Sequence, residues 1–334
     1  MNFAAPSPPA DAWFDPAADA WVLSRYADVL AALRHPQLWT ITAAGKDQME
    51  VRDDSGKLAA RNTMIEQLAQ SKVAGWRRDF EPLAAAILDA LPTDRVVDLL
   101  HDFARPCCLR LAILVTGADP ADGARLGELS AAAFGGTGAP AGSETRARAT
   151  QATTELGEYF ASSTPGMGEP AFVGTSQTMT RLLSNGLLAL LCHPDEYQRL
   201  QREPQLVPTA VEELLRYAGI VPTLYRRAYA PVEIGAARMA ERDQVHLKIA
   251  SANRDPAQFP DPDRLDLARR AVSHLSLGMG RNSCVGNLVI RMASAVLIST
   301  LSARFPAARI AGDIAWTATR SFCWPDAVPV LLQP

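Results

Sequence analysis

Apolar residues recur three and four positions apart along most of the chain, a spacing that predicts amphipathic helices. We expect helices over 26–33, 57–92, 96–116, 121–134, 146–161, 170–191, 194–203, 206–217 and 287–305, with one helix of the second range following Pro82. Shorter apolar runs predict strands at 20–23, within 226–236, at 244–249 and at 327–332. The pattern predicts a mainly α fold with a small β component, placed mainly after residue 220, in a single domain covering residues 1–334.

Four stretches interrupt the helical pattern. Residues 1–19 are rich in Ala, Pro and Asp and are expected to form a loose entry segment. Residues 40–56 are polar and irregular, and 135–145 are glycine-rich and the most flexible part of the chain. Residues 253–270 contain three prolines, which enforce a fixed irregular path.

Composition narrows the class of protein. The 334 residues carry a formal net charge of −3, with 48% hydrophobic and 21% charged residues, typical of a globular protein with a sizeable core. This charge gives no reason to expect nucleic acid as a partner. We expect no signal peptide and no membrane span, and the five cysteines fit neither a disulfide framework nor a zinc pattern. A cytoplasmic protein is the expectation that follows.

One cysteine has an unusual setting. The segment His274–Gly286 contains three glycines and delivers Cys284 to the start of the apolar helix predicted at 287–305. The positive end of a helix favours thiolate over thiol, and glycines let the backbone pass close to a flat group. A thiolate held in this way is a good axial ligand for haem iron. The alternative is a buried, inert cysteine in a turn.

A charged pair and a rigid loop precede this cysteine. Glu213 and Arg216 are three residues apart on a predicted helix and can pair on one face. Such a pair is usually solvated and contributes little to stability. If the meander 253–263 folds over it, Arg264 or a neighbour can complete a buried charge cluster behind the cysteine loop, as structural support.

These stretches, in this order, resemble the cytochrome P-450 family of haem-thiolate enzymes, of the soluble bacterial kind. The family's E-x-x-R helix corresponds to Glu213 and Arg216, its Asn-Arg-Asp-Pro…Phe-Pro-Asp-Pro-Asp meander to 253–263, and its Gly-x-Gly-x-x-x-Cys-x-Gly loop to 278–286. The match extends over roughly residues 170–305. The resemblance implies the cytochrome P-450 fold, haem b as cofactor and Cys284 as the iron ligand.

The resemblance also implies which residues surround the haem. In the family, two cations four residues apart contact the haem propionates, and Lys57 and Arg61 have that spacing here. A later arginine of the family corresponds to Arg226.

Within the family's loop, Gly278 and Gly286 are retained. Asn282 replaces a frequent histidine, and Leu277 replaces the usual phenylalanine. Both changes are expected to alter how the loop shields the sulfur.

The centre of the helix predicted at 170–191 departs further from the family pattern. Family members have an acid followed by a threonine there, which relay protons to bound oxygen. The corresponding residues are Gln177 and Thr178, so the alcohol is retained and the acid is lost. A glutamine forms hydrogen bonds but exchanges no proton at neutral pH.

The chain is also shorter than typical members, because the roof regions around 162–169 and 40–56 are trimmed. We expect reduced helices over the active site and a small-molecule substrate that is bulky, carrier-bound, or covered by a partner protein. By family analogy, pocket residues are expected from 40–56, 129–145, 170–180, 219–225 and 318–326, with Leu224 and Phe322 among them.

Three functions stay open. The first is an oxidative tailoring enzyme of the monooxygenase type, supplied with electrons by a ferredoxin-type partner and acting in secondary metabolism. The second is a haem-thiolate enzyme that catalyses an isomerisation, dehydration, cyclisation or peroxide-driven reaction, which Gln177 favours. The third is a haem-binding protein without catalysis.

Overall fold

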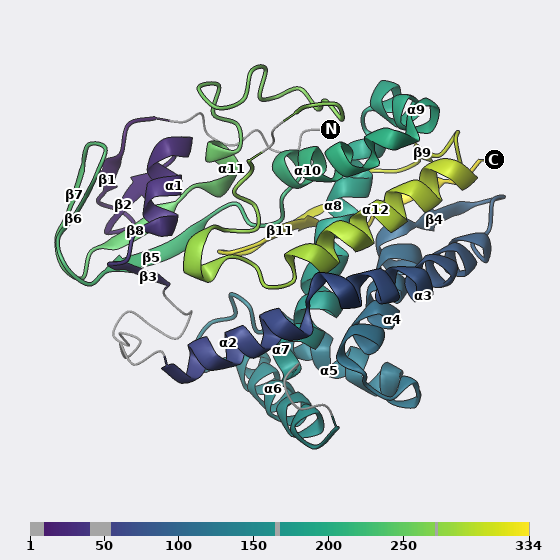
Figure 1. Ribbon diagram of the computed structural model, residues 1–334, viewed down its shortest axis with the longest axis horizontal. Coiled ribbons are helices and arrows are strands. Elements are labelled where there is room, and N and C mark those ends of the chain that lie inside the picture. Colours follow the sequence, from purple (N-terminus) through teal and green to yellow (C-terminus); the bar gives the residue numbers. More distant parts are fainter. Residues whose placement is uncertain (1–9, 41–54, 164–167, 271–272, 334) are drawn as a thin grey trace.

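The computed structural model describes residues 10–40, 55–163, 168–270 and 273–333 (Figure 1). Helices dominate it, as the sequence predicts. The helices are α1 (Tyr26–Arg34), α2 (Ser55–Gln67), α3 (Gln70–Asp89), α4 (Arg105–Thr116), α5 (Gly123–Gly135), α6 (Glu144–Ser163), α7 (Gly168–Val173), α8 (Met179–Leu191), α9 (Pro194–Arg202), α10 (Val207–Tyr217), α11 (Ile249–Ala252) and α12 (Asn287–Arg304).

Several shorter helical segments connect these helices. Two π-helical segments, η1 (Leu99–Ala104) and η3 (Gly174–Thr178), continue directly into α4 and α8. The segments α7, η3 and α8 therefore form one long helix with a π-helical centre. The 3-10 turns are η2 (Pro120–Asp122), η4 (Pro204–Leu206) and η5 (Gly280–Asn282).

The β structure lies in small sheets along one side of the helices and near the C-terminus (Figure 1). The largest sheet has the order β1-β2-β8-β5-β3, and β2 pairs with β8 in parallel, Ala20 opposite Gln244. The strands are β1 (Trp13–Asp15), β2 (Ala20–Leu23), β3 (Leu38–Thr40), β4 (Val96–Asp98), β5 (Leu224–Ala228), β6 (Val232–Ile234), β7 (Ala237–Met239), β8 (Gln244–Leu247), β9 (Arg309–Ile310), β10 (Trp316–Ala318), β11 (Cys323–Pro325) and β12 (Pro329–Leu331).

Three expectations need correction. Most strands of the described residues follow residue 220, as expected, but β1 lies inside the segment expected to be loose, where it pairs with β2. Strand β3 was not expected, because its partner β5 is distant in sequence. Residues 96–98 pair with β12 instead of starting a helix. Pro82 lies inside α3, and the chain breaks earlier, between Gln67 and Gln70. Because Pro82 has no N–H, the carbonyl of Arg78 loses its intrahelical hydrogen-bond donor. Both residues are exposed, so water can replace that hydrogen bond.

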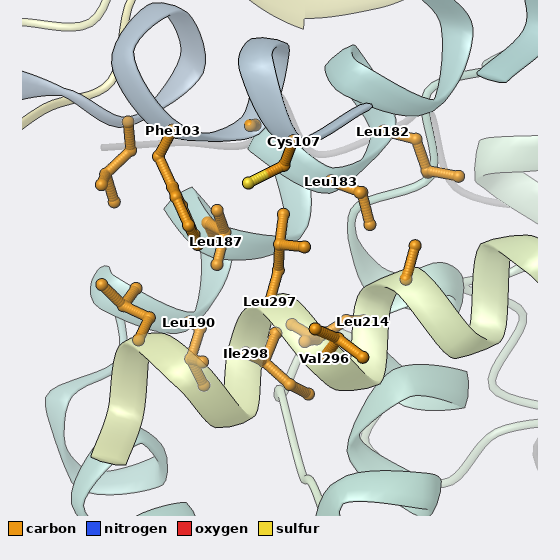
Figure 2. Close-up of a cluster of buried hydrophobic side chains, with 14 of the residues drawn as sticks. Phe103, Cys107, Leu182, Leu183, Leu187, Leu190, Leu214, Val296, Leu297 and Ile298 are labelled. Carbon is orange, nitrogen blue, oxygen red and sulfur yellow. The ribbon is translucent and has the colours of Figure 1, made fainter. Parts of the chain in front are cut away.

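The main core lies where α8 and α12 meet helices α3, α4 and α10. Figure 2 shows Leu183 and Leu187 of α8 among Leu297 of α12 and Phe103 of η1. Cys107 lies in the same cluster and is fully buried like its neighbour Cys108, as expected for core residues. Burial raises the pKa of Cys108 to about 12. This core anchors the helices that carry the candidate site.

Candidate active site

The loop before Cys284 is shaped by two glycines. Gly278 and Gly280 have φ values of +68° and +70°, a region that disfavours residues with a Cβ. A Cβ on Gly280 would also approach the Leu33 carbonyl oxygen at 3.1 Å. The turn closes where the Cys284 N–H donates a hydrogen bond to the Leu277 carbonyl at 2.8 Å. The loop therefore holds the cysteine just before α12.

Gly286 differs from the other two glycines. Its φ is −79°, and a Cβ there would meet only the Cys284 Sγ at 3.9 Å. The protein's own packing thus does not require glycine at this position. That Gly286 lets a flat group pass close to the sulfur stays a prediction.

Burial has the largest effect on the Cys284 thiol and raises its pKa. The Gly286 N–H and the charges of Arg61 and Arg291 act in the opposite direction but do not outweigh burial. The backbone N–H therefore favours thiolate, as expected, while burial, which the sequence does not reveal, acts against it. The features that favour thiolate are present, and a metal cation bonded to the sulfur would add to them.

Arg61 extends from α2 to the cysteine loop. Its Nη2 donates to the Ser283 carbonyl at 2.6 Å and lies 3.2 Å from the Ser283 hydroxyl. The side chain of Lys57, one turn earlier, lies outside the part of the chain that the structure describes. Asn282 is exposed on the 3-10 turn of the loop.

Arg226 is a buried cation on β5, with 3% of its surface exposed. Its Nη1 donates to the Tyr225 carbonyl at 2.9 Å, and no carboxylate among the described residues lies within ion-pair distance. Burial, together with the charge of Arg281, lowers the pKa of Arg226 to about 10. A buried cation of this kind is costly without an anion, so its setting fits a haem propionate.

The pair Glu213–Arg216 is fully buried. Arg216 binds both carboxylate oxygens at 2.7 and 2.8 Å and donates to the Asn253 and Pro262 carbonyls of the meander. The second cation is Arg269, whose Nε lies 3.1 Å from Glu213. Arg264 contributes only its backbone carbonyl, so the neighbour Arg269, and not Arg264, completes the charge cluster.

A second ion-pair group supports the loop from α10. Glu212 binds Arg291 of α12 at 2.6 Å and lies 3.3 Å from Nε2 of the buried His274. Burial alone would raise the pKa of Glu212, but hydrogen bonds from His274 and Arg291 lower it to about 2. No local pattern in the sequence marks this group, because its members come from separate segments.

In the long helix, Gln177 and Thr178 face different surroundings. The Gln177 side-chain amide donates to the Ser130 hydroxyl of α5 at 2.8 Å and accepts from Arg181 at 3.1 Å. Thr178 instead lines a cavity of about 300 Å³. The polar run at 175–177 is buried, so it is not a solvent-facing stripe.

The Thr178 cavity lies among α5, α6, the long helix and the loop before β11. Glu169 is the one carboxylate of its lining, and burial raises the pKa of that group. Its wall includes Phe322, and most of it comes from the stretches expected to form the pocket: Ala133, Phe134, Thr137, Thr153, Glu169, Pro170, Val173, Gly174, Thr178 and Phe322.

The site thus combines, in a mainly α fold, a cysteine presented by a glycine loop, a buried cation with no carboxylate beside it among the described residues, and a helix with a π-helical centre. The family model for cytochrome P450 matches residues 170–309. Cytochrome P450-SU2 of Streptomyces griseolus is 30% identical over 87% of this chain and 81% of its own length. The chain belongs to the cytochrome P450 family, a family of haem-thiolate monooxygenases.

Another relative and a solved structure agree with this family assignment. The 6-deoxyerythronolide B hydroxylase of Saccharopolyspora erythraea is 27% identical over 82% of this chain and 75% of its own length. The fold is similar to that of P450BioI, solved in complex with an acyl carrier protein bearing hexadec-9Z-enoic acid. That likeness has a TM-score of 0.86 at 22% identity and covers 98% of this chain and 96% of the other.

Within the described residues, no helix has the length and apolarity needed to cross a membrane.

Proposed function

We propose that this protein is a monooxygenase-type oxidative tailoring enzyme that oxidises a small organic substrate in secondary metabolism. The observation that carries this proposal is the cavity of about 300 Å³ whose wall includes the Thr178 hydroxyl and the aromatic ring of Phe322. A largely apolar pocket with a few polar groups suits a small organic molecule. The similarity to the 6-deoxyerythronolide B hydroxylase supports secondary metabolism.

In this proposal Cys284 is the thiolate ligand of haem b, whose thiolate-bound iron favours O–O bond cleavage when the cofactor is present. Arg226 neutralises a propionate, and Arg61 and Lys57 add positive charge from α2. Gly278 and Gly286 keep the backbone clear of the cofactor, while Leu277 and Asn282 complete the loop around it. Glu213 and Arg216 hold the meander behind this loop and touch no substrate.

Proton delivery in this proposal is atypical. The Gln177 amide is held by Ser130 and Arg181, so it fixes the helix but carries no exchangeable acid proton. Thr178 orders the hydrogen bonds of the cavity, and water or a substrate hydroxyl supplies the proton there.

The same feature favours a second candidate. A haem-thiolate enzyme that performs an isomerisation, dehydration, cyclisation or peroxide-driven reaction has no need of an acid beside Thr178. Gln177 is the observation that favours it.

We propose a ferredoxin-type protein as the electron donor. A substrate attached to a carrier protein is part of the proposal, since P450BioI binds an acyl carrier protein and has a similar fold. The stretch 41–54, expected to be a trimmed part of the roof, lies outside the described residues.

The test begins with the haem-loaded protein. Reduced and treated with carbon monoxide, it is expected to give the red-shifted Soret band of thiolate ligation, and Cys284→Ser is expected to lose that band. Cys192→Ser, which changes another half-buried cysteine, is the matched control. A red-shifted band that persists in Cys284→Ser contradicts the ligand assignment.

The reaction is then tested with a panel of macrolactones and carrier-bound fatty acids, a ferredoxin with its reductase, and isotope-labelled dioxygen. A monooxygenase incorporates the label into product only when reductant is supplied. Turnover without reductant, or with peroxide alone, favours the second candidate over the first.

A further inference from the structure

A second cavity lies on the other side of the long helix, between α4, α5, α8 and β11, and has a volume of about 280 Å³. It shares no lining residue with the Thr178 cavity. The lining combines cations, polar groups and apolar walls: Leu100, His101, Arg105, Ala131, Gln177, Thr180, Arg181, Trp324 and Asp326. No role proposed above requires this cavity.

The charges in this cavity do not balance. Arg105 and Arg181 have no carboxylate within ion-pair distance among the described residues. The His101 ring already has a partner, because its Nδ1 lies 2.6 Å from the Asp98 carboxylate. Asp326 is the single carboxylate of the lining, and it accepts a hydrogen bond from the Thr317 hydroxyl. An excess of positive charge therefore faces the cavity.

The Arg181 guanidinium is held in place before any ligand arrives. It lies 4.1 Å from the ring centroid of Phe134 and 5.0 Å from that of Trp324, and Nη1 donates to both oxygens of Gln177. Burial, followed by the charge of Arg105, lowers the pKa of Arg181 to about 10. A cation that is fixed, half-buried and without a counterion gains from an anion beside it.

We propose that this cavity binds the carboxylate of a small organic acid, as a second ligand site separate from the Thr178 cavity. A planar guanidinium matches a carboxylate in shape and binds it with two hydrogen bonds. Asp326 at the same lining disfavours dianions, which makes a singly charged carboxylate a better match than a phosphate. Leu100, Ala131 and the Trp324 ring offer an apolar surface to the carbon chain of the acid.

The site also touches the helix centre. Gln177 lines this cavity and accepts from Arg181, while the next residue, Thr178, lines the other cavity. An acid that binds Arg181 therefore contacts a residue that is hydrogen-bonded to Gln177 of the π-helical segment η3. Occupancy of one cavity is expected to alter the affinity of the other.

Isothermal titration calorimetry of the full haem-loaded chain tests the site. The probes are hexanoate and benzoate, with hexanamide and benzamide as neutral matches. We expect the acids to bind and the amides to bind at least roughly ten-fold more weakly, because a charged hydrogen bond is lost. Arg181→Gln and Arg105→Gln are each expected to lower the affinity for the acids. Arg110→Gln, at an exposed position of α4, is expected to leave that affinity unchanged.

Four results would overturn the proposal. These are equal affinity for acids and amides, no binding of either acid, equal weakening of acid binding by Arg110→Gln and Arg181→Gln, and complete displacement of the acids by saturating imidazole at the haem, as opposed to a limited change in their affinity. The last result would mean that the acids occupy the Thr178 cavity. If Arg181→Gln does not fold, Arg105→Gln and the acid–amide comparison decide, since Arg105 is exposed and its loss leaves the core intact.

Discussion

Two regions of the molecule contain arginines that are buried or half-buried: the cluster that supports the cysteine loop, and the face of α8 toward α5. The two regions differ in whether the arginine has a carboxylate partner. Arg216 has a carboxylate that binds it through two hydrogen bonds, and backbone carbonyls take its remaining donors. Arg181 has two aromatic rings and one glutamine, and no carboxylate among the described residues. The neutralised Glu213–Arg216 cluster stabilises the fold, whereas Arg181, a cation without a counterion, is where we propose that a ligand binds.

Breaking the buried cluster gives the largest expected effect. Glu213→Ala leaves Arg216 buried without a counterion, which costs about 3–5 kcal/mol of unfolding free energy. Urea unfolding followed by circular dichroism measures this loss. Glu81→Ala breaks the exposed pair with Arg77 and is expected to cost less than about 1 kcal/mol. Similar losses in the two variants would mean that burial of the cluster adds nothing.

Acid gives the next largest effect, through Glu212. Its pKa is about 2 in the folded protein and 4.5 as a free group, so the folded state binds fewer protons. The stabilisation is present above about pH 4.5 and is lost as the pH falls from there toward 2, at most about 3 kcal/mol. Urea unfolding at several acidic pH values tests this. Glu212→Gln is expected to flatten the dependence, and an unchanged slope would contradict the assignment.

The turn of the cysteine loop is the third target. Gly280→Ala places a Cβ at a φ of +70° and 3.1 Å from the Leu33 carbonyl, so a loss of about 1–2 kcal/mol is expected. Thermal unfolding of the haem-loaded protein measures it. Gly75→Ala in α3, where a Cβ meets nothing within 4 Å, is expected to be neutral or to stabilise by about 1 kcal/mol. If Gly280→Ala unfolds at the same temperature as the unmodified protein, the conformation of the loop does not depend on this turn.

The smallest net effect on stability is expected at Gln177. Gln177→Glu places a buried carboxylate beside Arg181, where the cost of desolvating the carboxylate and the gain from the new ion pair oppose each other, so the free energy of unfolding is expected to change by only about 1 kcal/mol. If proton delivery limits the reaction, this variant raises the fraction of electrons recovered in product. Gln70→Glu adds the same charge at an exposed site. An unchanged fraction in Gln177→Glu would remove the proton-delivery argument.

The sequence predicted the elements that depend on local spacing. The loop at 278–286, the pair Glu213–Arg216 and the long helix at 170–191 follow from nearby residues, and the fold agrees with all three. The N–H contribution at Cys284 has the expected direction, but the larger effect of burial on the pKa of its thiol could not be predicted, because that burial comes from the tertiary structure.

Contacts between segments that are distant in sequence could not be predicted. Arg269 closes the Glu213 cluster from 56 positions away, and the rings around Arg181 come from α5 and β11. No local pattern marks an arginine as lacking a counterion. The single-domain organisation and the trimmed roof stay predictions.

The parallel pairing of β2 with β8 has a consequence for synthesis of the chain. Ala20 to Leu23 pair with Gln244 to Leu247, so the early strand is made long before its partner. At about 5–20 residues per second, a ribosome needs roughly 10–45 s to cover that interval. During that time the largest sheet lacks a central strand, and Val22 and Leu23, buried in the finished fold, have no cover from β8. The nascent chain therefore has a window in which a chaperone that shields apolar strands would raise its yield.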